Sequence, residues 1–392
     1  MIKLESYTSS ASDAAKDIYR FEGVTNVLGT GYHDDEISEV FTPFHFRTFR
    51  FIRVNIDVGS SGLVLHNIEI ETVNYHLDVR ASVKVTSSDD LSHKLWETSL
   101  QYAMDTQSSA LFTYYLSGDD RRAPSHKPQT IPHFSLFWIC MLKDYLDFFG
   151  DKTFLAPLVP IVDAILNYFH CRLDQRLGLV ASDMQPGIWN FVDWTEQWRP
   201  YGIPPAVMRT GIPTYINHLY AYASKNAAAL LTSLGRPSIA EEYMYRAGRL
   251  VHSLQLHCFD GQFFTDSLVS SADKATDYSV YNQVWAVLSG AATEKTGQEI
   301  LRRSLDPAAR DSFVQASISM SFYTLRALRP VARPALGLTT WEGDGVSQRS
   351  DCHAWGSTPI YEFMAEVVGL RPTDPGWSSI LFQPRLALYR EL

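Results

Sequence analysis

Residues 213–258 read PTYINHLYAYASKNAAALLTSLGRPSIAEEYMYRAGRLVHSLQLHC. Apolar side chains recur every three or four residues in each half of this stretch, at Leu219, Tyr222, Ala223 and Leu230 and again at Leu250, Leu254 and Leu256. Such spacing places apolar side chains along one side of an α-helix. Gly235 lies between the halves, where a glycine commonly ends a helix. The stretch therefore predicts two helices, over 213–234 and 238–258, joined by a short link.

The same periodicity extends on both sides of this pair. We expect further helices over 91–116, 132–149, 155–176, 278–292, 295–304 and 312–328. Glycines near several expected ends are candidate C-caps, at Gly150, Gly178 and Gly290. Many helices joined by short links, without a sequence repeat, favour helical hairpins that close on one another. The predicted fold class is mainly α.

The two ends of the chain have strand-like patterns. Residues 41–58 and 63–85 are rich in Val, Ile and aromatic residues with partial alternation, and the SSG at 60–62 predicts a hairpin turn between them. This region is short for a complete β-sandwich, which needs roughly seven strands. Residues 378–382 again predict a strand. We therefore predict a partial β-sandwich over 1–86, a helical domain over 87–370 and the start of a β element over 371–392.

Composition excludes several classes of protein. The formal net charge of −9 and the pI of about 5.7 argue against a nucleic-acid-binding surface or a polybasic membrane patch. Hydrophobic residues at 45% and charged residues at 20% argue against a mostly disordered chain. The four cysteines are far apart and form no C-x-x-C pair, so we expect neither a zinc site nor a disulfide framework.

Targeting signals are missing from the sequence. The N-terminus has no apolar signal-peptide core, no window approaches the length of a membrane span, and no N-x-S/T sequon occurs. These absences favour a cytoplasmic protein. We expect no metal or cofactor, and the sequence makes no prediction of the oligomeric state.

The stretch 184–198, MQPGIWNFVDWTEQW, combines tryptophans and acids without helical or strand periodicity. Trp189, Asp193 and Trp194 fit a sugar subsite, because an indole ring stacks on the C–H face of a sugar while a carboxylate accepts its hydroxyls. The alternative is a loop that is held in place by buried tryptophans.

Two other stretches carry candidate acids. Residues 337–355 contain Glu342 flanked by Trp341 and Gly343, with His353 nearby, which fits a general base; the alternative is a polar surface loop. Asp105 lies on a mostly apolar face of the helix expected over 91–116, and it either lines a pocket or is solvated. Cleavage of a glycosidic bond normally requires two carboxylates.

Seven ordered strings resemble the α-L-rhamnosidases of glycoside hydrolase family 78: LWETS (95–99), LQYAMDTQ (100–107), ALFTYYLSGDDR (110–121), PQTIPHFSLFW (128–138), IWNFVDWTEQW (188–198), YNQVWAVLSG (281–290) and GLTTWEGDGVSQRSDCHAWGSTPIYEF (337–363). The similarity runs from about residue 40 to about 385. It implies an (α/α)6-barrel glycosidase-like domain over 87–370 with β-sandwich neighbours. It also implies inverting, metal-independent hydrolysis of terminal α-L-rhamnose from a rhamnoside or other small glycoside.

The resemblance also assigns roles to residues. Glu342 matches the general base of the family, and Asp105 matches an acid that binds the sugar near the cleaved bond. Asp193 and Trp194 match a sugar-contacting pair, and His353 matches a histidine that faces the same pocket. Trp189 and Trp341 would form walls of the pocket or stack on the sugar.

The general acid of the family has no clear counterpart here. In the family an Asp-Cys-Pro motif is followed by a Glu, the general acid, seven positions before the sugar-binding Asp. Here no Asp-Cys-Pro occurs, and the nearest acid, Glu97, stands eight positions before Asp105. One extra helical position rotates a side chain by about 100°. Glu97 is the candidate acid, and an ordinary solvated glutamate is the alternative.

Two further stretches look abridged against the family pattern, between Arg122 and Pro128 and between Leu328 and Gly337. A catalytically impaired relative that binds sugar, or a vestigial gene product, is therefore the alternative to an active rhamnosidase. A third hypothesis, a terpenoid cyclase, is disfavoured because Asp119–Arg122 lacks the further spaced acid of a DDxxD motif. The stretch HDDE at 33–36, one histidine and three acids, fits a solvated turn better than a metal site.

Overall fold

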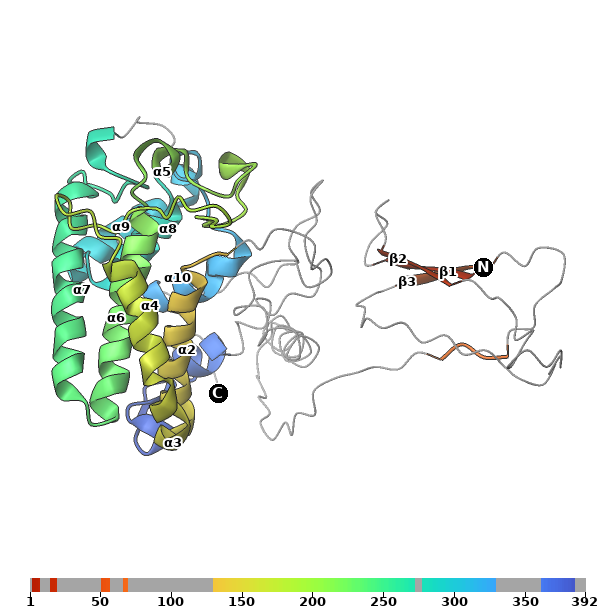
Figure 1. Cartoon of the computed structure of the whole chain (residues 1–392), viewed down its shortest axis with the longest axis horizontal. Helices are drawn as coiled ribbons and strands as arrows, with labels where there is room; N and C mark the ends of the chain where they lie inside the picture. The colour runs from red at the N-terminus through yellow and green to blue at the C-terminus, as the bar shows by residue number, and fades with distance from the viewer. Residues whose placement is uncertain are drawn as a thin grey trace. The chain divides into compact units, whose positions relative to one another are not determined.

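The computed structural model describes residues 2–7, 15–19, 51–56, 66–69, 130–271, 277–328 and 361–384. The chain divides into two units, one comprising 1–76 and 342–352 and the other comprising 77–341 and 353–392 (Figure 1). We call the second the helical unit. The predicted domain boundaries at 86 and 370 stay predictions.

Most described residues of the helical unit lie in helices, which confirms the mainly α prediction. The α-helices are α2 Phe134–Phe149, α3 Lys152–Leu155, α4 Val159–His170, α5 Pro205–Thr210, α6 Thr214–Ser233, α7 Pro237–His257, α8 Val280–Ser289, α9 Glu294–Ser304 and α10 Ser321–Leu328. The helices predicted over 132–149, 213–234, 238–258, 278–292 and 295–304 are confirmed to within three residues at each end. The helix predicted over 91–116 lies outside the described residues.

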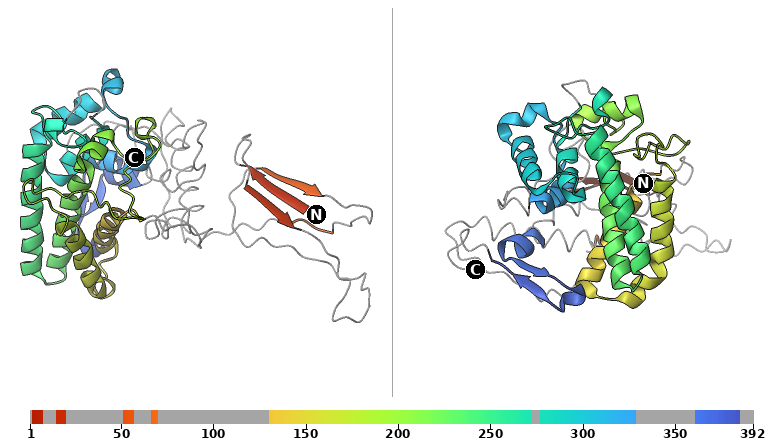
Figure 2. Two further views of the ribbon diagram at one scale, coloured as in Figure 1. Left: turned by 45° about the horizontal axis from the view of Figure 1, so that its top comes forward. Right: turned by 90° about the vertical axis from the view of Figure 1, so that its left-hand side faces the viewer.

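The two ends of the helical unit differ in the length of the connections between helices. The short link 234–236 joins α6 to α7, whereas the links 171–204 and 258–279 are long and lie at the end that holds α5 (Figures 1 and 2). We call this end, with its segments 171–213, 258–271, 277–279 and 313–320, the loop end. Candidate site residues from distant parts of the sequence can meet there.

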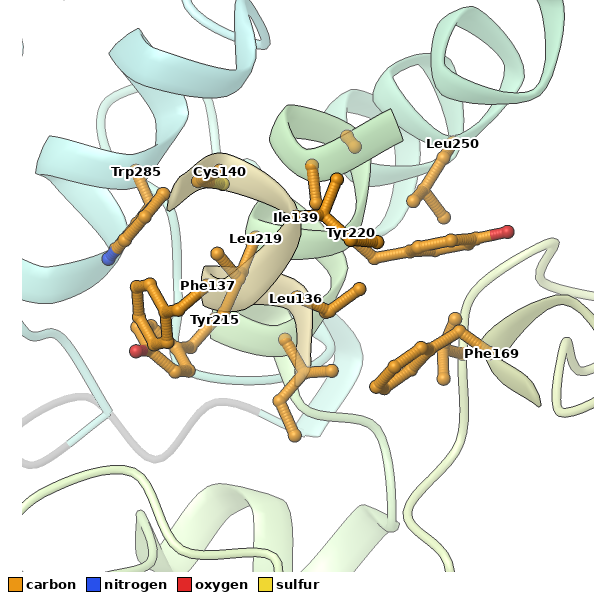
Figure 3. Packing of buried hydrophobic residues seen from close by; sticks show 14 of the residues in the cluster. Leu136, Phe137, Ile139, Cys140, Phe169, Tyr215, Leu219, Tyr220, Leu250 and Trp285 are labelled. Atoms are coloured by element: carbon orange, nitrogen blue, oxygen red, sulfur yellow. The ribbon is translucent and has the colours of Figure 1, made fainter. Parts of the chain in front are cut away.

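Helix α2 packs at the centre of the main hydrophobic core. Its buried side chains Leu136, Phe137, Ile139 and Cys140 meet residues of four other helices, as Figure 3 shows for Phe169 of α4, Tyr215, Leu219 and Tyr220 of α6, Leu250 of α7 and Trp285 of α8. Burial of a large apolar side chain stabilises the fold by roughly 1.5–3 kcal/mol. Burial also raises the pKa of the Cys140 thiol, so Cys140 is an inert core residue.

An ion pair crosses the same helices. The Arg326 guanidinium lies 3.1 Å from the Asp144 carboxylate of α2, donates to the Tyr222 hydroxyl of α6 at 3.1 Å and stacks over the Phe322 ring. The carboxylate of Asp144 remains partly exposed. This pair fixes α10 against α2 and α6.

The helix predicted over 155–176 is wrong at its C-terminal end. Helix α4 stops at His170, and the chain turns at 174–179, where the Asp174 carboxylate accepts the N–H groups of Arg176 and Leu177. A short acid that bonds nearby backbone N–H groups competes with helix formation. Gly178 therefore lies in this turn with φ +63° and not at a helix C-cap, whereas Gly150 and Gly290 are C-caps as predicted.

The helix predicted over 312–328 is wrong in its first half, since α10 begins only at Ser321. The preceding segment is extended and pairs with the residues before α8, because Val314 donates to Tyr278 O and accepts from Val280 N. This pairing is a tertiary contact that the local periodicity does not reveal.

Both ends of the chain contain antiparallel strands. Strands β1 Ile2–Tyr7, β2 Ala15–Tyr19 and β3 Phe51–Ile56 form a sheet in the order β2-β1-β3, with Ile2 opposite Tyr19 and Ile56. Strand β3 confirms strand structure within 41–58, but 66–69 form no strand. The SSG turn at 60–62 lies outside the described residues, and the partial β-sandwich stays a prediction.

The C-terminal part of the helical unit ends in a hairpin of β4 Leu370–Pro372 and β5 Ile380–Phe382, which confirms the strand predicted over 378–382. The link between these strands packs on the end of α2. There the Trp377 ring lies 5.6 Å from the Phe148 ring, and the backbones of Gly150 and Gly376 approach so closely that a Cβ on Gly150 would lie 3.1 Å from Gly376 Cα.

Among the described residues, one segment, Lys152–His170, has the length and apolar composition of a membrane span, so the expectation that no window approaches that length is wrong. Within it, Val162, Leu166 and Phe169 are buried in the main core. The apolar residues on the side of α4 that carries Val162, Leu166 and Phe169 therefore pack against α2, α6 and α7.

Two leucines on α7 provide a matched test of the core. Leu254 is fully buried, whereas Leu256 is 64% exposed and does not belong to the buried face that the sequence assigned to it. We expect Leu254→Ala to lower the free energy of unfolding by about 2–5 kcal/mol, because it removes buried methyl groups and leaves a cavity. Leu256→Ala makes the same chemical change on the same helix and should cost less than about 0.5 kcal/mol.

Urea unfolding of both variants, followed by far-UV circular dichroism, measures the difference. Equal effects of the two substitutions would contradict this packing of α7.

Candidate functional site

Three of the sequence-predicted site residues, Trp189, Asp193 and Trp194, lie within the described residues, on the long link between α4 and α5. The link belongs to the loop end. The other predicted site residues are Glu97, Asp105, Trp341, Glu342 and His353, and they lie outside the described residues. Their roles stay predictions.

The first part of this link is closed at its base by side chains. The Asn190 amide donates to the Asp183 carbonyl at 2.9 Å and accepts the Asp183 N–H at 3.2 Å. The Asp183 carboxylate accepts hydrogen bonds from the Tyr168 hydroxyl and the Arg172 guanidinium of the preceding helix and turn. Burial tends to raise the pKa of Asp183, but these hydrogen bonds outweigh it and lower the pKa. The loop 183–190 is thereby fixed to the helical scaffold.

The second part of the link folds back on itself between Val192 and Gly202. Val192 N–H donates to Gly202 O at 2.7 Å, and Gly202 N–H donates to Trp198 O at 2.8 Å. Gly202 has φ +64°, and a Cβ there would lie 2.5 Å from the Phe191 ring, so a larger residue would displace that ring. Trp198 is buried in the main core. For Trp198, the alternative of a buried tryptophan that holds the loop is therefore correct.

Asp193 is the buried carboxylate of this loop, with 4% of its surface exposed. Its Oδ2 accepts hydrogen bonds from the Tyr281 hydroxyl at 2.7 Å, from the Ser319 hydroxyl at 2.5 Å and from the Ser317 hydroxyl. Its Oδ1 accepts the N–H of Trp194 at 2.6 Å. The donors come from α8 and from the segment before α10, where Ser319 belongs to the short 3-10 helix Ile318–Met320, so one carboxylate joins three separate parts of the loop end.

Sequence reasoning missed Tyr281, Ser317 and Ser319. Tyr281 stands in a string that carries the family resemblance, but neither periodicity nor spacing singled it out. The two serines fall in the segment that was predicted to be helical. Ser319 lies in the short 3-10 helix Ile318–Met320, and no local pattern of the sequence singles it out.

Three aromatic rings of the loop that carries Asp193 pack on one another. The rings of Trp189, Phe191 and Trp194 lie with their centroids 4.7–5.5 Å apart, at tilted or edge-to-face angles. The Trp189 indole N–H donates to Tyr201 O at 2.9 Å, which fixes its ring. Trp194 is 38% exposed. The loop thus presents a supported aromatic surface to solvent beside a buried carboxylate.

His133 lies at the start of α2 and is fully buried. Its ring packs edge-to-face on Tyr215 at 5.6 Å, and neither ring nitrogen has a hydrogen-bond partner among the residues that the structure describes. Burial lowers the pKa of His133 to about 3, so the imidazole is neutral at physiological pH. In this arrangement it is a packing residue.

A second buried carboxylate, Asp266, lies in the link between α7 and α8. Its Oδ1 accepts hydrogen bonds from Ser279 and from the Asn282 amide, and its Oδ2 has no partner within the described part of the chain. Burial, and secondarily the nearby charge of Asp277, raise the pKa of Asp266 to about 7. Asp277 itself forms an ion pair with Arg209 at 2.6 Å. These contacts tie the link to α5 and α8.

The described part of the site contains groups that can bind a ligand. It contains an aromatic surface and one carboxylate, Asp193, whose Oδ2 is occupied by three donors. Within the described ranges, no group of three or more His, Cys, Asp or Glu side chains is arranged to hold a metal ion. A pair of carboxylates for acid and base catalysis would have to include residues outside these ranges.

The structure is similar to solved rhamnosidases. The GH78-family rhamnosidase of Bacillus sp. GL1 matches with a TM-score of 0.60 and 23% sequence identity, over 76% of this chain and 37% of that enzyme. A rhamnosidase from Klebsiella oxytoca with rhamnose bound matches with a TM-score of 0.45 and 20% identity, over 59% of this chain and 46% of that one. No protein-family model and no curated protein matches the chain.

The chain therefore has a rhamnosidase-like fold, and it spans little more than a third of the length of the Bacillus enzyme. At this level of identity the likeness concerns the fold and not the activity.

Asp266 predicts a pH dependence of stability. Its pKa is about 7 in the folded chain, against a model-peptide value of 3.8, so between pH 4 and 7 the folded chain keeps a proton that the unfolded chain releases. The free energy of unfolding therefore falls as pH rises through this window, by up to about 1.4 kcal/mol per pH unit. We expect Asp266→Asn to remove this contribution, so that the variant gains stability relative to the wild type from pH 4 to pH 7.

Asp260→Asn is the control in urea unfolding at pH 4, 5, 6 and 7. Burial tends to raise the pKa of Asp260, but hydrogen bonds from Tyr278 and from backbone N–H groups outweigh it and lower the pKa. Its titration falls below the window, so the difference between Asp260→Asn and the wild type should stay constant. A constant difference for Asp266→Asn as well would show that Asp266 does not titrate as described.

Proposed function

We propose that this protein is a glycoside hydrolase-like protein that binds the terminal α-L-rhamnose of a small rhamnoside at the loop end and hydrolyses its glycosidic bond with inversion. The observation that carries the proposal is the likeness of the fold to the Bacillus GH78 rhamnosidase. The helical unit would be an (α/α)6-barrel, of which α2, α6, α8 and α10 supply inner helices. Because the chain covers 37% of that enzyme, its activity enters here as a proposal.

The described residues support the binding half of this function. A sugar places C–H groups on one face and hydroxyls at its edge, so it fits an aromatic surface beside a carboxylate. Trp194 supplies an exposed ring, and Trp189 supports it at 5.5 Å. Asp193 holds the Trp194 backbone through Oδ1. In the proposal, the Trp194 ring stacks on the rhamnose ring. The aglycone lies on the side of the site that faces solvent.

The catalytic half rests on the sequence. In an inverting mechanism, one acid protonates the leaving oxygen while a base activates water on the opposite face of the sugar, with the carboxylates about 6.5–9.5 Å apart. Glu342 would be the base, Asp105 would bind the sugar and Glu97 would be the acid. His353 and Trp341 would line the same pocket.

A second candidate function is favoured by one specific observation. No Asp-Cys-Pro…Glu segment precedes Asp105, and Glu97 stands one position away from the spacing of the family. A chain without a working general acid would lose about 10²–10⁴-fold in rate. It would keep the aromatic surface and act as a rhamnose-binding protein.

Hydrolysis of p-nitrophenyl α-L-rhamnoside tests the catalytic proposal. We expect turnover by the wild type and a loss of at least about 10²-fold in Glu342→Gln, because the base is removed while the shape of the side chain is kept. Unchanged turnover in Glu342→Gln would show that another residue is the base.

Calorimetric titration with L-rhamnose tests the binding proposal independently of catalysis. Trp194→Ala should weaken binding, whereas Tyr245→Ala, which removes an exposed ring on α7, should leave the affinity unchanged. Binding without hydrolysis favours the second candidate function. A folded wild type that neither binds nor hydrolyses rhamnosides would contradict both.

A further inference from the structure

Two of the three hydroxyl groups on Asp193 Oδ2, those of Tyr281 and Ser317, also accept a backbone N–H group. Tyr281 Oη accepts the Ser317 N–H at 2.9 Å, and Ser317 Oγ accepts the Ser319 N–H at 3.3 Å. Each of these backbone N–H groups occupies a lone pair of a hydroxyl oxygen. The hydrogen of that hydroxyl is then left to point at another acceptor. A carboxylate is an acceptor only, so both hydroxyl hydrogens are directed at Asp193.

The same contacts reach the exposed ring of the loop. Asp193 Oδ2 is held by the hydroxyls, and Oδ1 holds the Trp194 N–H at 2.6 Å. On its other side, the Tyr281 ring packs against the buried Trp198 ring with centroids 5.0 Å apart. The loop is thus fixed on both sides of Trp194, through residues of α8 and of the segment before α10.

We propose that Tyr281, Ser317 and Ser319 are positioning residues of the sugar site, which hold Asp193, and through it Trp194, in the binding arrangement before a ligand arrives. The inference rests on the proposed function, because it names the residues that shape that site. Rigid prearrangement of a binding loop raises affinity because less conformational entropy is lost on binding.

Tyr281→Phe removes one hydroxyl and keeps the ring. Tyr278→Phe is a matched control, since the Tyr278 hydroxyl also donates to a carboxylate, Asp260 at 2.6 Å, but away from Asp193. In calorimetry with L-rhamnose, we expect Tyr281→Phe to weaken binding by about tenfold or more, the usual effect of losing a hydrogen bond to a charged group. Tyr278→Phe should change the affinity by less than about twofold.

Ser319 provides a second comparison, should Tyr281→Phe fail to fold. Ser319→Ala should weaken rhamnose binding, and Ser319→Thr, which keeps a hydroxyl, should restore most of it. A purely structural role predicts a lower urea midpoint in Ser319→Ala with unchanged affinity of the folded protein. That result, or equal affinities of the wild type and Tyr281→Phe, would overturn the proposal.

A readout without ligand separates this inference from the proposed function. The fluorescence of Trp194 is obtained as the difference between each protein and its Trp194→Phe counterpart, and acrylamide quenching reports how exposed and mobile the ring is. We expect stronger quenching in Tyr281→Phe than in the wild type or Tyr278→Phe. If the wild type does not bind rhamnose, the proposed function fails, and this quenching comparison alone decides whether the hydroxyls position the ring; equal quenching overturns the inference.

Discussion

A carboxylate that is taken out of water must find hydrogen-bond donors in the protein, and at the loop end this requirement falls on Asp193. Four donors to its carboxylate come from its own loop, from α8 and from the segment before α10. The cost of leaving such a group unpaired is on the order of several kcal/mol, more than any single exposed contact in these loops contributes. The position of three loop segments therefore depends on one side chain.

The helices make this arrangement possible because α8 carries one of the donors, Tyr281, to the loop end. Tyr281 is fully buried at the start of α8, and four residues later Trp285 packs against α2 in the main core. A one-turn spacing on α8 thus connects the core to the loop end. The opposite end, with its short links and its β4–β5 hairpin, carries no comparable network among the described residues.

The helical scaffold was predictable, whereas the site network was not. The periodicity of 213–258 predicts α6 and α7 because buried apolar residues dominate the energy of those helices. It fails at 312–320, where backbone pairing with 278–280 and hydroxyl bonds to Asp193 outweigh a helical preference. Leu256 shows a smaller failure, because an apolar residue in a periodic pattern still faces solvent. The candidate residues Trp189, Asp193 and Trp194 were found by composition, but their partners lie about 90–130 positions away in sequence, beyond local patterns.

The central claim is that the loop end forms a rhamnose site around Trp194 and Asp193. A crystal structure of the protein with L-rhamnose tests it most directly. The account predicts that the sugar ring stacks on Trp194 while Asp193 Oδ2 keeps its bonds to Tyr281 and the serines. A sugar bound away from this loop, or one that displaces the Tyr281 hydroxyl from Asp193, would contradict the account.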